Sequence, residues 1–158
     1  MIDELVRALE LRPHPEGGFY KETYRAQARV ETPRGSRSAG TAIYYLLPRG
    51  EFAAWHQVAS DEVWHFYEGA PLTLYLLSAQ GLETVTLGRE VLRGERPQVT
   101  VPAGVLQAAV PNGDFTLAGC TVAPGFDFAD WEMPSLDTLL ARYPEHAELF
   151  RRFTSPRL

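Results

Sequence analysis

The sequence predicts an all-β domain, an antiparallel sandwich or barrel with a short helix before its strands and helices after them. Three observations support this prediction. About nine short segments rich in β-branched and aromatic residues recur at regular spacing, glycine or proline turn signals separate them, and no helical pattern lies between them. The predicted strands are residues 19–25, 41–47, a segment ending near 58, 62–67, 72–77, 83–87, 98–101, 105–110 and 115–122.

The N-terminal residues predict a helix, a loop and the first strand. Apolar side chains recur near helical spacing over residues 2–11, so we expect a short amphipathic helix that ends before Pro13 and caps a sheet. The adjacent Gly17 and Gly18 indicate backbone conformations, or a close approach, that a side chain would block. Residues 31–40 form a polar connection, which we expect as a loop over the mouth of a pocket.

Turn residues define the central strands. Gly40 and Pro48 bound the strand 41–47. A tight polar turn at residues 59–61 joins the next two strands, which predicts a hairpin closed by Gly69. Residues 111–114 combine proline, asparagine, glycine and aspartate, a strong turn signal between the last two strands.

Two helices are expected at the C-terminal end. Ser135 can cap a helix over residues 136–143, and Pro144 can open a second one. We expect Trp131 and Phe126 to pack beneath these helices as structural anchors. The apolar stripe of the second helix consists of Ala147, Leu149, Phe150 and Phe153.

Length and composition limit the domain organisation. A chain of 158 residues that is 45% hydrophobic has the size of one ordinary domain, which buries roughly 70% of its unfolded surface. No internal repeat or linker is visible, so we expect a single domain over residues 1–158. Its core should cover about residues 14–128 and its C-terminal helices about residues 135–153.

The charge distribution argues against some partners. A net charge of −5 and a pI near 5.4 disfavour a nucleic acid or an anionic membrane surface, because both need a basic footprint. Residues 21–49 carry six basic and two acidic side chains, whereas residues 126–150 carry one arginine and six acidic side chains. These two segments either attract one another, within or between subunits, or form an ordinary solvated surface.

Cysteine content and hydropathy predict a cytoplasmic protein. Cys120 is the single cysteine, so no disulfide can form within the chain, and its apolar neighbours indicate a buried small hydrophobe. The first residues lack the features of a signal peptide, and no run approaches the ~18 apolar residues of a membrane span. Phosphate-binding glycine loops, Cys-x-x-Cys pairs and Gly-x-Ser-x-Gly turns are also absent from the sequence.

One stretch between two glycines combines histidines, acidic residues and tryptophans. Gly50 is followed by His56, then Glu62, then Gly69, and strand alternation directs His56 and Glu62 into one interior. This spacing resembles the first cupin motif, with Val58 where the motif places a second histidine. It implies a double-stranded β-helix, the cupin jelly roll.

Two further features strengthen the resemblance. Pro102, Gly104 and Gln107 match the second cupin motif, with glutamine in the histidine position. Residues 14–20, 60–65 and 123–128 resemble the signature segments of the cupin-5 branch, whose activity is not settled.

The candidate site centres on His56 and Glu62 as catalytic residues. A histidine facing the interior can also be a structural group held by a hydrogen bond, but an ionised carboxylate there is costly unless it is paired or binds a metal. His65 should point away from Glu62 unless the strand is bulged, and His14 and His146 are expected to be bystanders. Candidate substrate-binding residues are Gln107, Tyr24, Tyr45, Trp64, Phe66, His65 and Arg37.

The resemblance implies a small polar metabolite, a sugar or sugar-nucleotide-like molecule, bound inside the barrel. Proton transfer of the epimerase or isomerase type would use His56 as general base and Glu62 as its partner acid. Cations at the mouth would bind a diphosphate, and the candidates are Arg25, Arg29, Arg34 and Arg37. The alternatives are a non-catalytic binding or sensing module and a metal-dependent cupin enzyme.

Full cupin metal sites use three histidines and one glutamate. Val58 cannot ligate, and Gln107 offers only an amide oxygen, so we expect no required cofactor. A weakly bound divalent metal would use His56, Glu62 and Gln107. We also expect a homodimer, with the strand 19–25 able to add across an interface.

Overall fold

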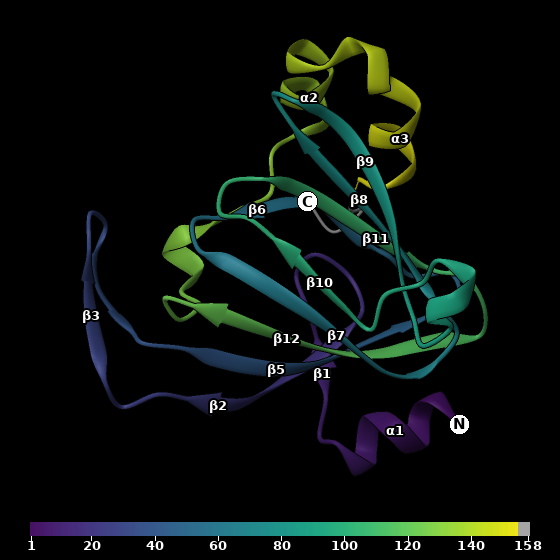
Figure 1. Ribbon diagram of the computed structural model, residues 1–158, viewed down its shortest axis with the longest axis horizontal. Coiled ribbons are helices and arrows are strands. Elements are labelled where there is room, and N and C mark those ends of the chain that lie inside the picture. The colour runs from purple at the N-terminus through teal and green to yellow at the C-terminus, as the bar shows by residue number, and fades with distance from the viewer. Residues whose placement is uncertain (155–158) are drawn as a thin grey trace.

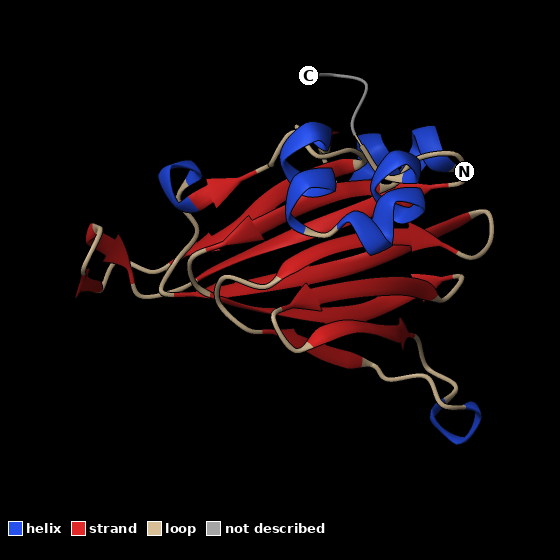
Figure 2. Cartoon of the chain, turned by 90° about the horizontal axis from the view of Figure 1, so that it is seen from above, coloured by secondary structure: helices blue, strands red, loops and turns tan. Residues whose placement is uncertain are grey.

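The computed structural model describes residues 1–154, and it confirms the all-β prediction. A six-stranded sheet in the order β1-β2-β5-β12-β7-β10 packs against a five-stranded sheet in the order β13-β6-β11-β8-β9 (Figure 1). Strands fill the middle of the molecule, and the helices lie at its periphery (Figure 2). The strands are β1 (Arg12–Pro13), β2 (Phe19–Arg25), β3 (Arg29–Thr32), β4 (Gly35–Ser38), β5 (Thr41–Pro48), β6 (Ala53–Val58), β7 (Asp61–Gly69), β8 (Leu72–Ser78), β9 (Gly81–Leu87), β10 (Gln98–Val101), β11 (Leu106–Pro111), β12 (Phe115–Ala123) and β13 (Trp131–Glu132). The helices are α1 (Ile2–Ala8), η1 (Val91–Arg93), η2 (Phe128–Asp130), α2 (Leu136–Arg142), η3 (Pro144–His146) and α3 (Ala147–Arg152).

The expected hairpin of the two central strands does not form. β6 pairs with β11 and β13, whereas β7 pairs with β10 and β12, so residues 59–60 cross from one sheet to the other. A tight polar turn is compatible with a hairpin and with such a corner, and sequence alternation does not distinguish them. His56 and Glu62 therefore face the interior from opposite sheets.

The interior between the sheets is packed with aromatic and aliphatic side chains. Tyr45 of β5 stacks on Trp64 of β7, with ring centroids 5.5 Å apart. Both side chains are almost completely buried, and leucines from β8 and β9 join them in one hydrophobic cluster. This packing makes the two sheets a rigid frame around the polar groups described below.

The helices cover the outer faces of the sheets. The apolar side of α1 packs on Leu46 and Leu117, which face away from the interior, so it caps a sheet as expected. At the other end, Phe150 of α3 packs edge to face on Trp55, and the Ser135 hydroxyl accepts the Thr138 N–H as the predicted cap of α2. The anchor beneath the C-terminal helices is thus Trp55. The expected anchors, Trp131 and Phe126, lie elsewhere and line the interior pocket.

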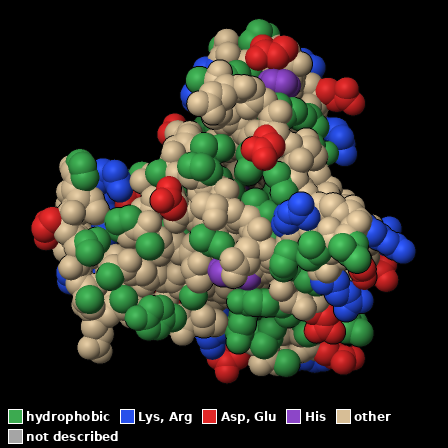
Figure 3. Space-filling view, in the orientation of Figure 1, with side chains coloured by type: hydrophobic (Ala, Val, Ile, Leu, Met, Phe, Trp, Pro, Cys, Tyr) green, Lys and Arg blue, Asp and Glu red, His purple; other side chains and the backbone are tan. Residues whose placement is uncertain are grey.

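The polar connection expected over residues 31–40 contains a two-stranded hairpin, β3–β4, which projects from the six-stranded sheet (Figure 1). Arg34 and Arg37 of this region bind the buried carboxylate of Asp130, with the Arg37 Nε–Asp130 Oδ2 distance at 2.8 Å. The basic and acidic segments of the sequence therefore attract one another within the subunit. On the face drawn in Figure 3, basic and acidic side chains are interspersed and form no single basic patch.

Candidate functional site

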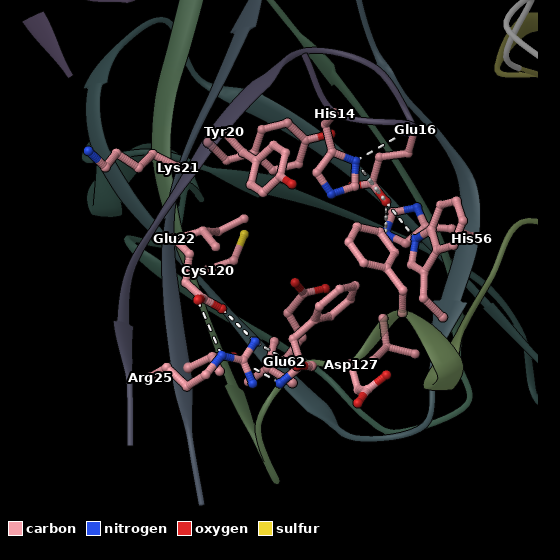
Figure 4. A pocket seen from close by; sticks show the side chains of 18 of the residues that line it. His14, Glu16, Tyr20, Lys21, Glu22, Arg25, His56, Glu62, Cys120 and Asp127 are labelled. Atoms are coloured by element: carbon pink, nitrogen blue, oxygen red, sulfur yellow. Dashed lines mark hydrogen bonds and ion pairs between the residues drawn. The ribbon is translucent and has the colours of Figure 1, made fainter. Parts of the chain in front are cut away.

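A pocket of about 620 Å³ opens between the two sheets. Both sheets, the loop before β2 and the segment leading into β13 contribute side chains to it (Figure 4). The volume lies within the range of small-molecule sites. Three imidazole or carboxyl groups cluster on one wall, and a second carboxyl lies on the opposite wall.

The loop before β2 places His14 and Glu16 on the first wall. Gly17 and Gly18 turn the chain sharply, with φ angles of +117° and +70°. A Cβ atom at Gly17 would collide with the carbonyl oxygen of Phe52, so only glycine fits there. The Tyr45 hydroxyl also donates a hydrogen bond of 2.7 Å to the carbonyl oxygen of Gly17, which fixes the loop over the pocket.

Glu16 is a buried carboxylate with several donors. Its Oε2 atom lies 3.2 Å from Nε2 of His56 and accepts a 3.1 Å hydrogen bond from the Trp131 indole. Burial raises the pKa of Glu16, but the charges of His14 and His56 and the Trp131 hydrogen bond outweigh burial and hold this pKa below its ordinary value. Glu16 is therefore ionised at neutral pH.

Both ring nitrogens of His56 face acceptors. Nδ1 lies 2.6 Å from the carbonyl oxygen of Ala54, which can only accept, so Nδ1 carries a proton. Nε2 faces the Glu16 carboxylate. These two contacts hold the imidazole of His56 in a fixed orientation against Glu16.

His14 has a different protonation pattern. Its Nδ1 atom accepts the backbone N–H of Glu16 at 3.1 Å, so the neutral ring carries its proton on Nε2. Burial lowers the pKa of His14, the charge of Glu16 opposes this shift in part, and the charge of His56 adds to it. The ring packs against Tyr20 and Tyr45, with centroids 4.7 and 5.4 Å away. The ring of His14 is therefore held in a fixed orientation in the pocket wall.

Glu62 lies on the opposite wall and is 8% exposed. Its Oε1 atom accepts a 2.7 Å hydrogen bond from Nε2 of Gln107, whose own Oε1 accepts the Trp64 indole N–H at 2.9 Å. An indole nitrogen can only donate, so this chain fixes the orientation of the amide. Burial, assisted by the charge of Glu16, raises the pKa of Glu62 to about 7, although His56 and Gln107 oppose the shift.

Comparisons with known proteins agree with this architecture. Residues 3–134 match the family model described as Cupin superfamily (DUF985). The chain belongs to the cupin superfamily, in its cupin-5 branch. It is similar to protein SO0799 from Shewanella oneidensis, with 42% identity, a TM-score of 0.90, and coverage of 98% of this chain and 97% of that one.

Two further relatives match this chain over most of their own length. A hypothetical protein from Leishmania major is 31% identical, with a TM-score of 0.91, and the match covers 96% of this chain and 97% of that one. The uncharacterized protein YML079W of Saccharomyces cerevisiae is 29% identical over 146 residues, which is 82% of this chain and 73% of that protein. Among residues 1–154 of this cupin, no helix is long and apolar enough to cross a bilayer.

Only some of the site residues expected from the sequence line the pocket. His56, Glu62 and Tyr45 line the pocket, whereas Gln107 and Trp64 lie behind Glu62 and hold it in place. Phe66 packs against the core cluster.

Three other candidates lie away from the pocket. Tyr24 is 59% exposed, and Arg37 is bound to Asp130. His65 points to the outer face of β7, as regular alternation predicts, and its Nε2 lies 2.9 Å from the Thr121 hydroxyl. Among the arginines considered for the mouth, Arg25 lines the pocket, whereas Arg29 contacts Ser36 and Arg34 is bound to Asp130.

Sequence reasoning missed part of the site. His14 was expected to be a bystander, but it is buried in the pocket wall, and Glu16 was not considered as a site residue. The available signal was the signature segment 14–20, whose paired glycines indicated a close backbone approach. Its position relative to His56 depends on tertiary contacts alone.

The residues of this cupin do not fit the metal site of its superfamily. Val58 lines the pocket without a donor atom, and the Gln107 oxygen is directed to Trp64, leaving only its NH₂ group toward Glu62. Within residues 1–154, no group of three or more His, Cys, Asp or Glu side chains is arranged to hold a metal ion. The expected ligand set of His56, Glu62 and Gln107 therefore lacks the glutamine oxygen.

Proposed function

We propose that this cupin binds a small polar metabolite in its pocket and transfers a proton on it, in a reaction of the isomerase or epimerase type. One observation supports the proposal most directly. Two buried carboxyl groups face the same pocket, and their pKa values are displaced in opposite directions, below the ordinary value for Glu16 and to about 7 for Glu62. Such divergence is how one site supplies both an ionised group and a neutral acid at the same pH.

The proposal assigns proton transfer to Glu62. A carboxyl with a pKa near 7 is populated in both protonation states at neutral pH, so it can accept a proton in one step and return it in the next. His56 is less suited to this role than the sequence suggested, because both of its nitrogens already face acceptors.

The first wall supplies charge stabilisation. When the Glu62 carboxylate removes a proton beside a carbonyl group, the C–H electron pair moves onto the carbonyl oxygen. The proposal assigns stabilisation of that negative charge to the imidazoles of His56 and His14, which line the first wall. Delivery of the proton from Glu62 to the former carbonyl carbon, with the proton of the adjacent hydroxyl passing to the enolate oxygen, completes an isomerisation with no net change in protons. Glu16 positions His56.

Solvent deuterium exchange tests this proposal. The protein is incubated in D₂O with a panel of aldoses, ketoses and keto acids, and incorporation at carbon is followed by nuclear magnetic resonance. We expect exchange that Glu62→Gln abolishes and Glu68→Gln preserves, because Glu68 is an exposed carboxylate on the same strand. Saturable binding with no exchange for any member would reject catalysis and favour the non-catalytic binding or sensing module.

We also propose that the protein is a homodimer. β2 pairs with β1 only at Tyr20 and Phe19, so within the described chain the outer edge of residues 21–25 has no strand partner. An unpaired edge of this kind supports strand addition from a second copy.

A further inference from the structure

Three basic side chains line the mouth of the pocket, and two of them have acidic partners. Lys21 forms an ion pair with Glu10, and Arg25 binds the Glu22 carboxylate and the carbonyl oxygen of Phe126. The third is Arg12 of β1, whose guanidinium forms no hydrogen bond or ion pair with any residue in the described range 1–154. Arg12 is therefore the cation at this mouth that is free to bind something else.

The sheet register directs Arg12 toward the pocket. Arg12 is opposite Tyr20 in the β1–β2 ladder, and Tyr20 is opposite Tyr45 in the β2–β5 ladder. Residues directly opposite one another in antiparallel strands project from the same face of the sheet. Tyr45 and Tyr20 both line the pocket, and the Tyr20 ring touches His14. A ligand held by Arg12 would thus extend past Tyr20 to the first wall.

The acidic groups at the mouth do not neutralise Arg12. Glu22 is bound to Arg25, while Asp127 accepts the backbone N–H of Ala129 and lies 3.9 Å from the Arg37 guanidinium. Deeper in the pocket, Glu16 is paired with His56. An incoming anion therefore meets one uncompensated guanidinium and carboxylates that already have partners.

We infer that the ligand of this pocket carries an oxyanion, a carboxylate or a phosphate, that Arg12 binds at the mouth. A guanidinium is planar and presents paired N–H donors, which match the two oxygens of a carboxylate or phosphate. The pocket that Arg12 and Glu62 both line has a volume of about 620 Å³, which leaves room for a polar body of monosaccharide size. This inference rests on the proposed function and narrows its substrate class to acidic metabolites.

Calorimetric titration with three matched probes tests the inference. Glucose, glucose 6-phosphate and glucuronate share a sugar body and differ in charge. At low salt we expect the two anions to bind the wild-type protein at least ~10-fold more tightly than glucose. Arg12→Gln should abolish this preference. Arg89→Gln should keep it, because Arg89 is an exposed arginine next to Glu90 and does not line the pocket.

The outcomes separate this inference from the proposed function. Equal affinity for glucose and both anions, an anion preference that survives in Arg12→Gln, or no binding of any probe would overturn the inference. A preference that depends on Arg12, together with no deuterium exchange in the assay above, would support the oxyanion site and reject the catalytic proposal alone.

Discussion

Replacing Glu62 by glutamine should remove a destabilisation that the wild-type protein suffers as the pH rises. The carboxyl is buried, and burial is the largest cause that raises its pKa from 4.5 to about 7. Glutamine resembles the protonated carboxyl in shape and keeps an oxygen that can accept the Gln107 N–H. The variant therefore reproduces the protonated form at every pH.

The sign and size of the effect follow from linkage. The folded protein binds this proton more tightly than the unfolded chain, so the stabilising contribution is complete below pH 4.5 and is lost as the pH rises to about 7. A pKa difference of about 2.5 corresponds to about 3 kcal/mol in the free energy of unfolding. For a domain of this size the corresponding change in Tm is about 6–12 °C.

Urea denaturation of both proteins between pH 4.5 and pH 8 measures the effect. Groups that titrate alike in both proteins cancel in the difference of their unfolding free energies, and this difference should change by about 3 kcal/mol in favour of Glu62→Gln. Glu68→Gln serves as the matched control, since that side chain is exposed, and it should track the wild type. A difference that stays constant across the range would refute the burial argument for Glu62.

Four further predictions follow from the structure. Gly17→Ala should destabilise the protein by at least ~2 kcal/mol more than Gly81→Ala in urea denaturation, because both glycines have φ of +117° but only Gly17 faces a backbone collision; equal losses would contradict this. Asp130→Asn should lower stability near pH 7, and the wild-type advantage should shrink as the pH falls below 3.8 toward the lowered pKa of Asp130, because the Arg37 hydrogen bond outweighs burial and lowers this pKa; an advantage that does not decline between pH 7 and pH 3 would count against it. Addition of manganese or zinc should change the Tm of the wild-type protein little; stoichiometric metal in the wild-type protein that is lost in His56→Ala would contradict the conclusion that the pocket lacks a metal site. Light scattering at micromolar concentration should give about twice the 17.7 kDa chain mass, and a monomer would reject the dimer.

The sequence by itself determined the local structure of this cupin. Alternation and turn residues located β2, β5, β8 and β10 to within a residue or two at each end, and Ser135 marked the start of α2. These features are readable because each depends on neighbouring residues along the chain. The same local reasoning directed His56 and Glu62 inward and His65 outward.

Tertiary structure alone decided how the site is assembled. Local alternation shows which side chains share a face of a strand, but not which sheet the strand joins, so the corner between β6 and β7 was taken for a hairpin. Glu16 meets an indole 115 residues further along the chain, and Glu62 meets an amide 45 residues away. The pKa of a buried carboxyl depends on such distant partners and on the water that they exclude, so the opposite shifts of these two groups exist only in the folded protein.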